Sequence, residues 1–92
     1  MYKIEKITDK EGNERTDGHY PNRKGSTVEL FHLRLDDSMI LGYRKDNQGN
    51  NKGGLLSTSI VEGFSKYNNT VKIETMNSIY YLTEVSNDNI SS

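Results

Sequence analysis

Three runs of alternating polar and apolar residues, separated by Asn-rich turns, fill the second half of the chain: 55–64, 70–76 and 79–85. An apolar residue at every second position is the pattern of a β-strand with one buried face. The last two runs flank a two-residue turn, Asn77-Ser78, which predicts an antiparallel hairpin. This half of the chain is therefore predicted to fold into a meander of three strands.

A further strand is predicted at the start of the chain. Tyr2, Ile4 and Ile7 lie in a β-leaning stretch in which the spacing of apolar residues changes from two to three. A strand keeps such residues on one face when an extra residue is inserted between them. We therefore expect a bulge or an early bend near Glu5 and Lys6.

A second hairpin is predicted in the middle of the chain. Residues 27–35 form its first strand, 36–38 a tight turn of short polar residues, and 39–43 its second strand. Val28 and Leu30 are expected on one face of the first strand. The main apolar face is expected on the other side, formed by the odd-numbered residues Phe31, Leu33 and Leu35.

Two long loops, 13–26 and 44–54, separate the predicted strands, and no stretch shows an apolar period of 3.6 residues over three turns. Regularly spaced short strands predict an all-β fold, and closure would protect the edges of so small a sheet. We expect a small antiparallel barrel of five to six strands, loosely similar to SH3-like barrels. It would form a single domain over residues 1–85, followed by a flexible, disordered tail over 86–92.

Composition excludes several classes of site. The 92 residues include no cysteine, which excludes disulfides, thiolate nucleophiles and Cys-ligated zinc. No stretch approaches the roughly 20 apolar residues that span a bilayer, and the N-terminus lacks the apolar segment of a signal peptide. We expect a soluble, cytoplasmic protein without a membrane partner. The two histidines form no metal-binding pair, so neither a metal nor a cofactor is expected.

Positive charge is concentrated in the two predicted loops. Segments 13–26 and 44–54 together contain six Lys or Arg residues and three Asp or Glu residues, whereas the whole chain has a net charge of −1. If both loops open at the same end of the barrel, that end is a positive rim on a slightly acidic body. Such a rim attracts phosphates, nucleotides or an acidic protein surface, although charged loops also serve to keep a small domain in solution.

The densest chemical patch is the segment 18–25, which combines an aromatic ring, an imidazole and two cations. Tyr20 could stack against a ligand ring while Arg23 and Lys24 bind its anionic group. In the alternative interpretation, Tyr20 and Pro21 lay a ring across the barrel mouth as a cap on the core. Arg23 and Lys24 would then be solvated.

These patterns predict a non-catalytic binding module rather than an enzyme. The expected partner is a protein or an anionic small molecule, and self-association through a strand edge is a further possibility. The residues expected to bind it are Tyr20, Arg23, Lys24, Arg44, Lys45 and Lys52. A small barrel that binds nucleic acid is an alternative, but the net charge of −1 provides little phosphate neutralisation.

No catalytic motif supports an enzyme. Three hydroxyl residues follow one another at 57–59, without the Gly-x-Ser-x-Gly pattern of an activated nucleophile, and the exposed edge of a strand explains them. The Gly-rich segment 47–54 lacks P-loop spacing and is interpreted as a mobile hairpin loop. A hydrolase remains an alternative if His19 or His32 lies within hydrogen-bond reach of a carboxylate in a pocket.

Tyrosines account for six of the eight aromatic residues, and tyrosine is favoured at binding surfaces. Tyr80 and Tyr81 are neighbours on one predicted strand, so their rings point to opposite faces. One ring is expected to join the core. The other is a candidate contact for Tyr43 or Tyr67.

Two segments of the C-terminal half carry a resemblance to known proteins. Residues 56–61, Leu-Ser-Thr-Ser-Ile-Val, and residues 75–82, Thr-Met-Asn-Ser-Ile-Tyr-Tyr-Leu, resemble a strand and a hairpin of small uncharacterised bacterial and phage β proteins. The resemblance covers about a third of the chain. It implies a fold and a bacterial or phage type of protein, and it supplies no functional residues.

Overall fold

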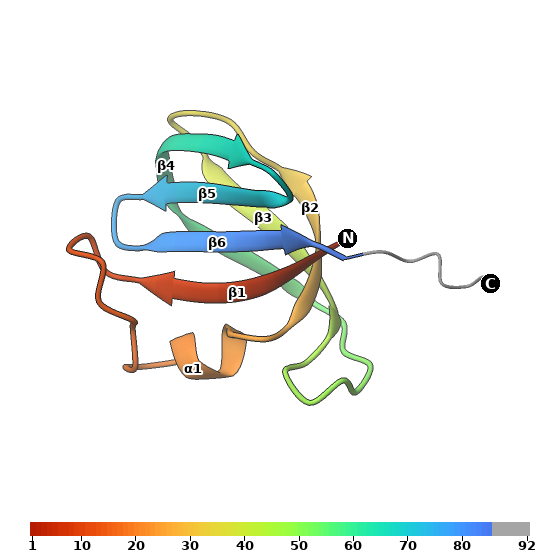
Figure 1. Cartoon of the computed structure of the whole chain (residues 1–92). Coiled ribbons are helices and arrows are strands. Elements are labelled where there is room, and N and C mark those ends of the chain that lie inside the picture. Colours follow the sequence, from red (N-terminus) through yellow and green to blue (C-terminus); the bar gives the residue numbers. More distant parts are fainter. Residues whose placement is uncertain (86–92) are drawn as a thin grey trace.

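The computed structural model describes residues 1–85, which form six strands and one short helix (Figure 1). The helix, α1 (Tyr20–Arg23), is a single turn inside the segment predicted as a loop. Pro21 favours this turn, because a proline at the start of a helix gives up no intrahelical hydrogen bond. The strands are β1 (Tyr2–Thr8), β2 (Thr27–His32), β3 (Ser38–Lys45), β4 (Leu55–Tyr67), β5 (Thr70–Thr75) and β6 (Ile79–Glu84).

The six strands form one closed antiparallel barrel. Each strand pairs with its neighbours in the chain, and β1 pairs with β6 to close the sheet. The predicted all-β barrel is confirmed, with the strands in simple meander order. The tail predicted for residues 86–92 lies outside the described residues.

The bulge predicted in β1 is present. The pairing of β1 with β6 shifts by one residue between Ile4 and Lys6, which leaves Glu5 as the extra residue. Ile4 and Ile7 are therefore both buried, at 0% and 1% exposed, although they are three positions apart. The irregular spacing of apolar residues in the sequence is thus explained by the local backbone.

The apolar face predicted for 27–35 is wrong at two of its three residues. Val28 and Leu30 pack in the core, whereas Phe31 and Leu35 are 54% and 56% exposed. Leu33, the third residue of the predicted face, does pack against the core. Successive residues of a strand point to opposite faces, so Phe31, next to the inward Leu30, faces outward. The register with β3 also shifts between Leu30 and His32, which marks a second bulge. The ring of Phe31 lies outside the barrel over Gly42 of β3, where no side chain competes for the space.

β4 changes partner along its length. Residues 55–60 pair with β3, and residues 61–67 pair with β5. Backbone hydrogen bonds of 2.9 Å from Asp36 N to Val61 O and from Val61 N to Asp37 O mark the point of change. The first half of β4 therefore has a strand neighbour on one side only.

The hairpin between β5 and β6 turns one residue earlier than predicted. Thr75 N donates to Ser78 O over 2.8 Å, so the two central residues are Met76 and Asn77. Ser78 N donates in turn to the Thr75 hydroxyl over 3.1 Å. Ser78 is 1% exposed because these two bonds draw it into the end of the barrel.

Two turns share the pattern Asp-x-x-Gly-Asn, at residues 9–13 and 46–50. In both, the Asp N–H donates to the Asn carbonyl over 2.8 Å, and the Gly N–H donates to the Asp carbonyl over 3.1 Å. The Asp Oδ1 accepts two further backbone N–H groups at 2.9 Å. The glycines have φ angles of 96° and 87°, which glycine adopts without strain. The segment interpreted as a mobile loop thus contains a turn with a full set of hydrogen bonds.

Side chains from all six strands fill the barrel. Burial of each contributes about 1.5–3 kcal/mol relative to leaving it in water. Because a small barrel is filled by its own side chains, a ligand has to bind at an end or on the outer surface. The buried cluster is Ile4, Ile7, Val28, Met39, Leu41, Leu56, Val61, Val71, Ile73, Tyr80 and Leu82.

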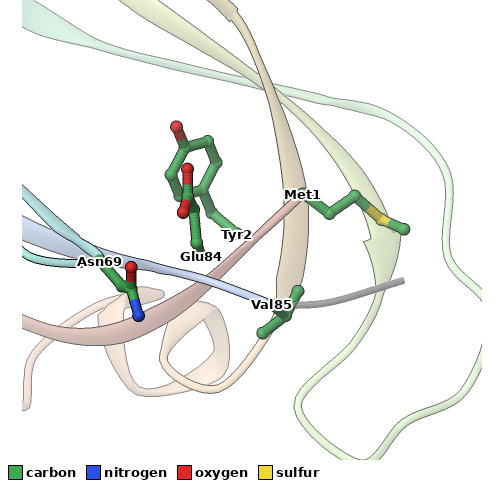
Figure 2. A pocket seen from close by; sticks show the side chains of 5 residues that line it. All are labelled: Met1, Tyr2, Asn69, Glu84 and Val85. Carbon is green, nitrogen blue, oxygen red and sulfur yellow. The ribbon is translucent and has the colours of Figure 1, made fainter. Parts of the chain in front are cut away.

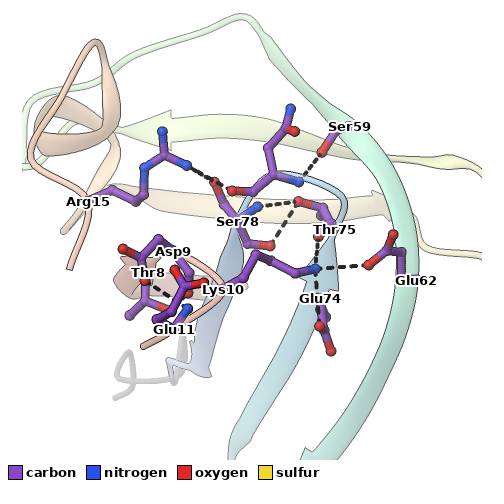
Figure 3. Close-up of polar contacts among 11 residues, drawn as sticks. Thr8, Asp9, Lys10, Glu11, Arg15, Ser59, Glu62, Glu74, Thr75 and Ser78 are labelled. Atoms are coloured by element: carbon purple, nitrogen blue, oxygen red, sulfur yellow. Dashed lines mark hydrogen bonds and ion pairs between the residues drawn. The ribbon is translucent and has the colours of Figure 1, made fainter. Parts of the chain in front are cut away.

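Polar contacts close the end of the barrel at the turn between β5 and β6 (Figure 3). Lys10 Nζ lies 2.9 Å from Glu62 Oε1 and 3.1 Å from Glu74 Oε2. The same amine donates to the carbonyl of Thr75 over 2.6 Å. Arg15 donates to the carbonyl of Asn77 over 2.8 Å, so the segment that follows β1 is joined to the turn between β5 and β6.

Candidate functional site

The two loops predicted to carry the site meet at one end of the barrel, where α1 and the hairpin between β3 and β4 both lie below the strands in Figure 1. A Cβ atom built on Gly25 would stand 3.1 Å from the Cβ of Asn47. Lys24 and Asn47 line the same groove between the loops. The condition on which a positive rim was predicted, that the two loops lie at the same end, is therefore met.

Tyr20 caps the core at this end. Its ring packs against the buried cluster, and its hydroxyl accepts a hydrogen bond of 3.0 Å from Ser78 Oγ. The guanidinium carbons of Arg15 and Arg23 lie 4.3 and 5.0 Å from the ring centroid. Tyr20 thus matches the capping alternative, and its ring already contacts two cations.

Arg23 is neither fully solvated nor paired with a carboxylate. Its Nη1 donates to the hydroxyl of Tyr80 over 3.1 Å. Arg15 and Arg23 are the half-buried cations of residues 1–85; Arg15 pairs with Asp17 at 2.8 Å, whereas Arg23 forms no ion pair within that range. Because a guanidinium has five N–H donors, Arg23 keeps donors for an anion.

Two phenols surround the Arg23 charge. Burial raises the pKa of Tyr43 and of Tyr80 above the usual value for tyrosine, and the nearby Arg23 opposes this rise. Lys52 Nζ lies 4.4 Å from the centroid of the Tyr43 ring, which is a cation–π distance. Both phenols stay neutral at physiological pH, so they solvate Arg23 without cancelling its charge.

An open pocket of ≈ 260 Å³ lies between the α1 segment, the end of β3 and the start of β4. Among these described lining residues, two are cations and none is acidic. The local field is therefore positive although the net charge of the chain is −1. The lining residues are His19, Asn22, Arg23, Tyr43, Lys52, Leu55 and Leu56.

Four of the six predicted binding residues do not line this pocket: Tyr20, which caps the core, and the cations Lys24, Arg44 and Lys45. Lys24 Nζ lies 2.6 Å from Glu14 Oε2, and Arg44 Nη2 lies 2.6 Å from Glu29 Oε1. Lys45 is exposed at the end of β3. The charges of Lys24 and Arg44 are thus compensated within the protein.

The pocket joins two predicted residues to residues that the sequence did not identify. Arg23 and Lys52 line it, and Tyr20 contacts Arg23 from the core side. Tyr43 and Tyr80 were not predicted as site residues. No local signal marks them, because barrel closure is what brings β6 to α1.

The two neighbouring tyrosines of β6 divide as expected. Tyr80 joins the core at 2% exposed, and the ring of Tyr81 lies 4.7 Å from Lys6 Nζ. Of the two contacts predicted for the outward ring, the one with Tyr43 is wrong, and the one with Tyr67 stays a prediction. Tyr43 packs against the core, on the same side of the sheet as Tyr80.

A second pocket, of ≈ 420 Å³, lies where β1 begins and β6 ends, beside the turn between β4 and β5 (Figure 2). It contains a carboxylate and no cationic side chain among its described lining residues. It therefore offers no charged side chain that favours an anion. The lining residues are Met1, Tyr2, Asn69, Glu84 and Val85.

One histidine has a carboxylate partner. His32 Nε2 lies 3.0 Å from Asp37 Oδ2, and this hydrogen bond holds the pKa of the Asp37 carboxyl below its usual value. The pair brackets the turn between β2 and β3 and does not line the pocket beside Arg23. His19 lines that pocket, where no described lining residue is acidic. The pair and the pocket are thus in different places.

Within residues 1–85, no group of three or more His, Asp or Glu side chains is placed to hold a metal ion. The helix found in that range is far too short to cross a bilayer. Comparisons with protein-family models, curated proteins and solved structures found no match to this chain. Its function is therefore inferred from the pocket alone.

Proposed function

We propose that this protein is a non-catalytic binding module that recognises an anionic group, on a protein or a small molecule, in the pocket beside Arg23. The observation that carries the proposal is the state of Arg23: half-buried, bonded to Tyr80 and, within residues 1–85, without a carboxylate partner. A half-buried charge without a counter-ion costs stability. An incoming anion would remove that cost.

Arg23 and Lys52 offer an anion two kinds of contact. The planar fork of a guanidinium matches the two oxygens of a carboxylate or phosphate, and the ammonium of Lys52 acts as a point charge. His19 and Asn22 add polar groups to the lining of the pocket. The pocket is therefore suited to one carboxylate or one phosphate group.

The proposal assigns the module to the cytoplasm of a bacterium or to a phage protein acting there. A chain without cysteine needs no oxidising compartment. The resemblance of residues 56–61 and 75–82 to small bacterial and phage β proteins supports the same assignment.

Thermal unfolding in the presence of small anions tests this function. A ligand that binds only the folded state at ten times its Kd raises the free energy of unfolding by about 1.4 kcal/mol. We expect succinate or phosphate to raise the Tm in a buffer of low ionic strength, and neutral succinamide to leave it unchanged. If no anion raises the Tm under these conditions, the proposed function is wrong.

A further inference from the structure

The start of β4 presents a free strand edge beside the pocket. Residues 55–60 pair with β3 on one side, whereas β5 pairs with β4 only from Val61 onward. Beyond Thr58 the free side is covered, because Met76 N donates to Ile60 O and Asn77 N donates to Ser59 Oγ. The uncovered edge therefore runs over residues 55–58.

The hydrogen bonds to β3 show which backbone groups face this edge. Tyr43 N donates to Gly54 O over 2.9 Å, and the same register pairs Leu41 with Leu56. In an antiparallel ladder, alternate residues direct their N–H and C=O groups to the same neighbour. Since the backbone groups of Gly54 and Leu56 point toward β3, the backbone groups of Leu55 and Ser57 point away from it.

The free edge and the cations border the same pocket. Leu55 and Leu56 line the pocket together with Asn22 and Arg23. Leu55 is also 68% exposed, although it is a large apolar residue. Unpaired backbone groups, an exposed apolar side chain and an uncompensated guanidinium are thus adjacent.

We propose that the partner is an extended peptide segment of another protein, which adds a strand to the edge at Leu55 and Ser57 and places a carboxylate against Arg23. Strand addition of this kind draws affinity from main-chain hydrogen bonds and specificity from flanking side chains. That the peptide supplies a carboxylate rests on the proposed function. That its backbone adds a strand rests on the free edge of β4. A peptide fits both features, because it supplies carboxylates and a hydrogen-bonding backbone in one chain.

The test uses the acetylated pentapeptide amide Asp-Val-Thr-Val-Thr and two N-methylated forms of it. One form is methylated on both Val nitrogens and the other on both Thr nitrogens, so that each blocks one set of alternate backbone donors. We expect the parent peptide to bind about tenfold more tightly than succinate, since several backbone hydrogen bonds are added. One methylated form should bind like the parent and the other no better than succinate.

Amide NMR titration provides the readout. Binding should shift the backbone amides of Leu55 and Ser57 together with the side-chain NεH of Arg23. Equal binding of both methylated forms, or a parent peptide no tighter than succinate, would overturn strand addition while leaving the anion pocket intact. A different outcome would overturn the proposed function alone: peptide binding depends on which set of nitrogens is methylated, but it is unchanged in the Arg23→Gln variant.

Two variants of Ser57 provide a matched pair. Ser57→Pro removes the N–H that faces the edge, and proline is tolerated on strand edges. Ser57→Ala keeps the N–H and removes only the hydroxyl. We expect the proline variant to lose the tenfold advantage of the peptide over succinate and the alanine variant to keep it. The amide spectrum of each variant shows whether it is folded. Equal peptide binding by two folded variants would overturn the inference. If the amide shift of Ser57 depends on protein concentration in the absence of peptide, a second copy of the chain occupies the edge, and the inference of a peptide partner is overturned as well.

Discussion

The Nη1 atom of Arg23 donates a hydrogen bond of 3.1 Å to the hydroxyl of Tyr80, a residue that is 2% exposed. The bond joins α1 to β6 across 57 residues of sequence. It also holds the guanidinium at the edge of the pocket. Arg23 is therefore positioned by the barrel wall as well as by its own helical turn.

Tyr80→Phe tests this relationship. The phenyl ring keeps the core filled, so the variant should fold, with the free energy of unfolding lowered by about 0.5–1.5 kcal/mol for the lost hydrogen bond. Succinate binding should weaken, because Arg23 is no longer held in place. Urea unfolding and an NMR titration measure the two effects, and a folded variant with unchanged succinate affinity would show that the bond does not position Arg23.

The fold should lose stability at alkaline pH. Burial raises the pKa of Tyr80 in the folded state, whereas the unfolded chain ionises near the usual value of about 10. Above that pH the unfolded state binds fewer protons than the folded state, so the free energy of unfolding falls as the pH rises. Urea midpoints between pH 8 and 11 should decline less steeply in Tyr80→Phe than in the wild type. Equal slopes of urea midpoint against pH in the two proteins would indicate that burial does not raise the pKa of Tyr80.

The fold should also lose stability at acid pH. Backbone N–H groups, first those of Asn13 and Asn50, lower the pKa values of Asp9 and Asp46 in their turns. The stabilisation is present above the usual aspartate pKa of about 3.9 and is lost as the pH falls through the lower folded values. Urea midpoints at pH 7, 4 and 2.5 should show this decline.

Asp46→Asn is the matched variant, because an amide oxygen can accept the same backbone hydrogen bonds without a titrating charge. It should keep most of the stability at pH 7 and show a smaller loss between pH 4 and 2.5. Asp46→Ala, which lacks the acceptor, should be the less stable of the two at pH 7. Equal stability of both variants at pH 7 would mean that hydrogen bonds accepted by the side chain at position 46 do not stabilise the turn.

Gly42 and Phe31 should be energetically coupled. A Cβ on Gly42 would overlap the ring of Phe31. We expect Gly42→Ala to cost about 1–3 kcal/mol in the wild type, as overpacking does. In a Phe31→Ala background the same change should be neutral or stabilising by up to about 1 kcal/mol, because alanine is the better strand residue. A double-mutant cycle by urea unfolding with no coupling energy would contradict the packing of Phe31 on Gly42.

The fold could be predicted where the pattern is local. The period-two runs located β4, β5 and β6, and the break in spacing after Ile4 located the bulge in β1. The orientation of β2 could not be predicted, because both alternate sets of residues in 27–35 are apolar. The structure places Val28 and Leu30 in the core and the ring of Phe31 outside, over Gly42. The Asp-x-x-Gly-Asn pattern of residues 9–13 and 46–50 was a readable turn signal that the loop interpretation overlooked.

The site could be predicted only in part. Clustered charge pointed to Arg23 and Lys52, and both line the pocket. The same criterion selected Lys24 and Arg44, which are paired with carboxylates that the sequence does not place beside them. Which cations remain uncompensated depends on contacts across loops and strands, so it requires the folded structure.

Isothermal titration of succinate into the wild type, Arg23→Gln and Arg44→Gln tests the anion pocket most directly. Both variants lose one guanidinium charge, but Arg44 is exposed and paired with Glu29, outside the pocket. We expect Arg23→Gln to weaken binding by about tenfold or more, because a hydrogen bond to a charged group is worth roughly 1.5–3 kcal/mol. Arg44→Gln should change the affinity by less than about twofold, since the exposed charge of Arg44 is paired with Glu29 and screened by salt. Equal losses in the two variants would show that only net charge matters and that Arg23 does not form a binding site.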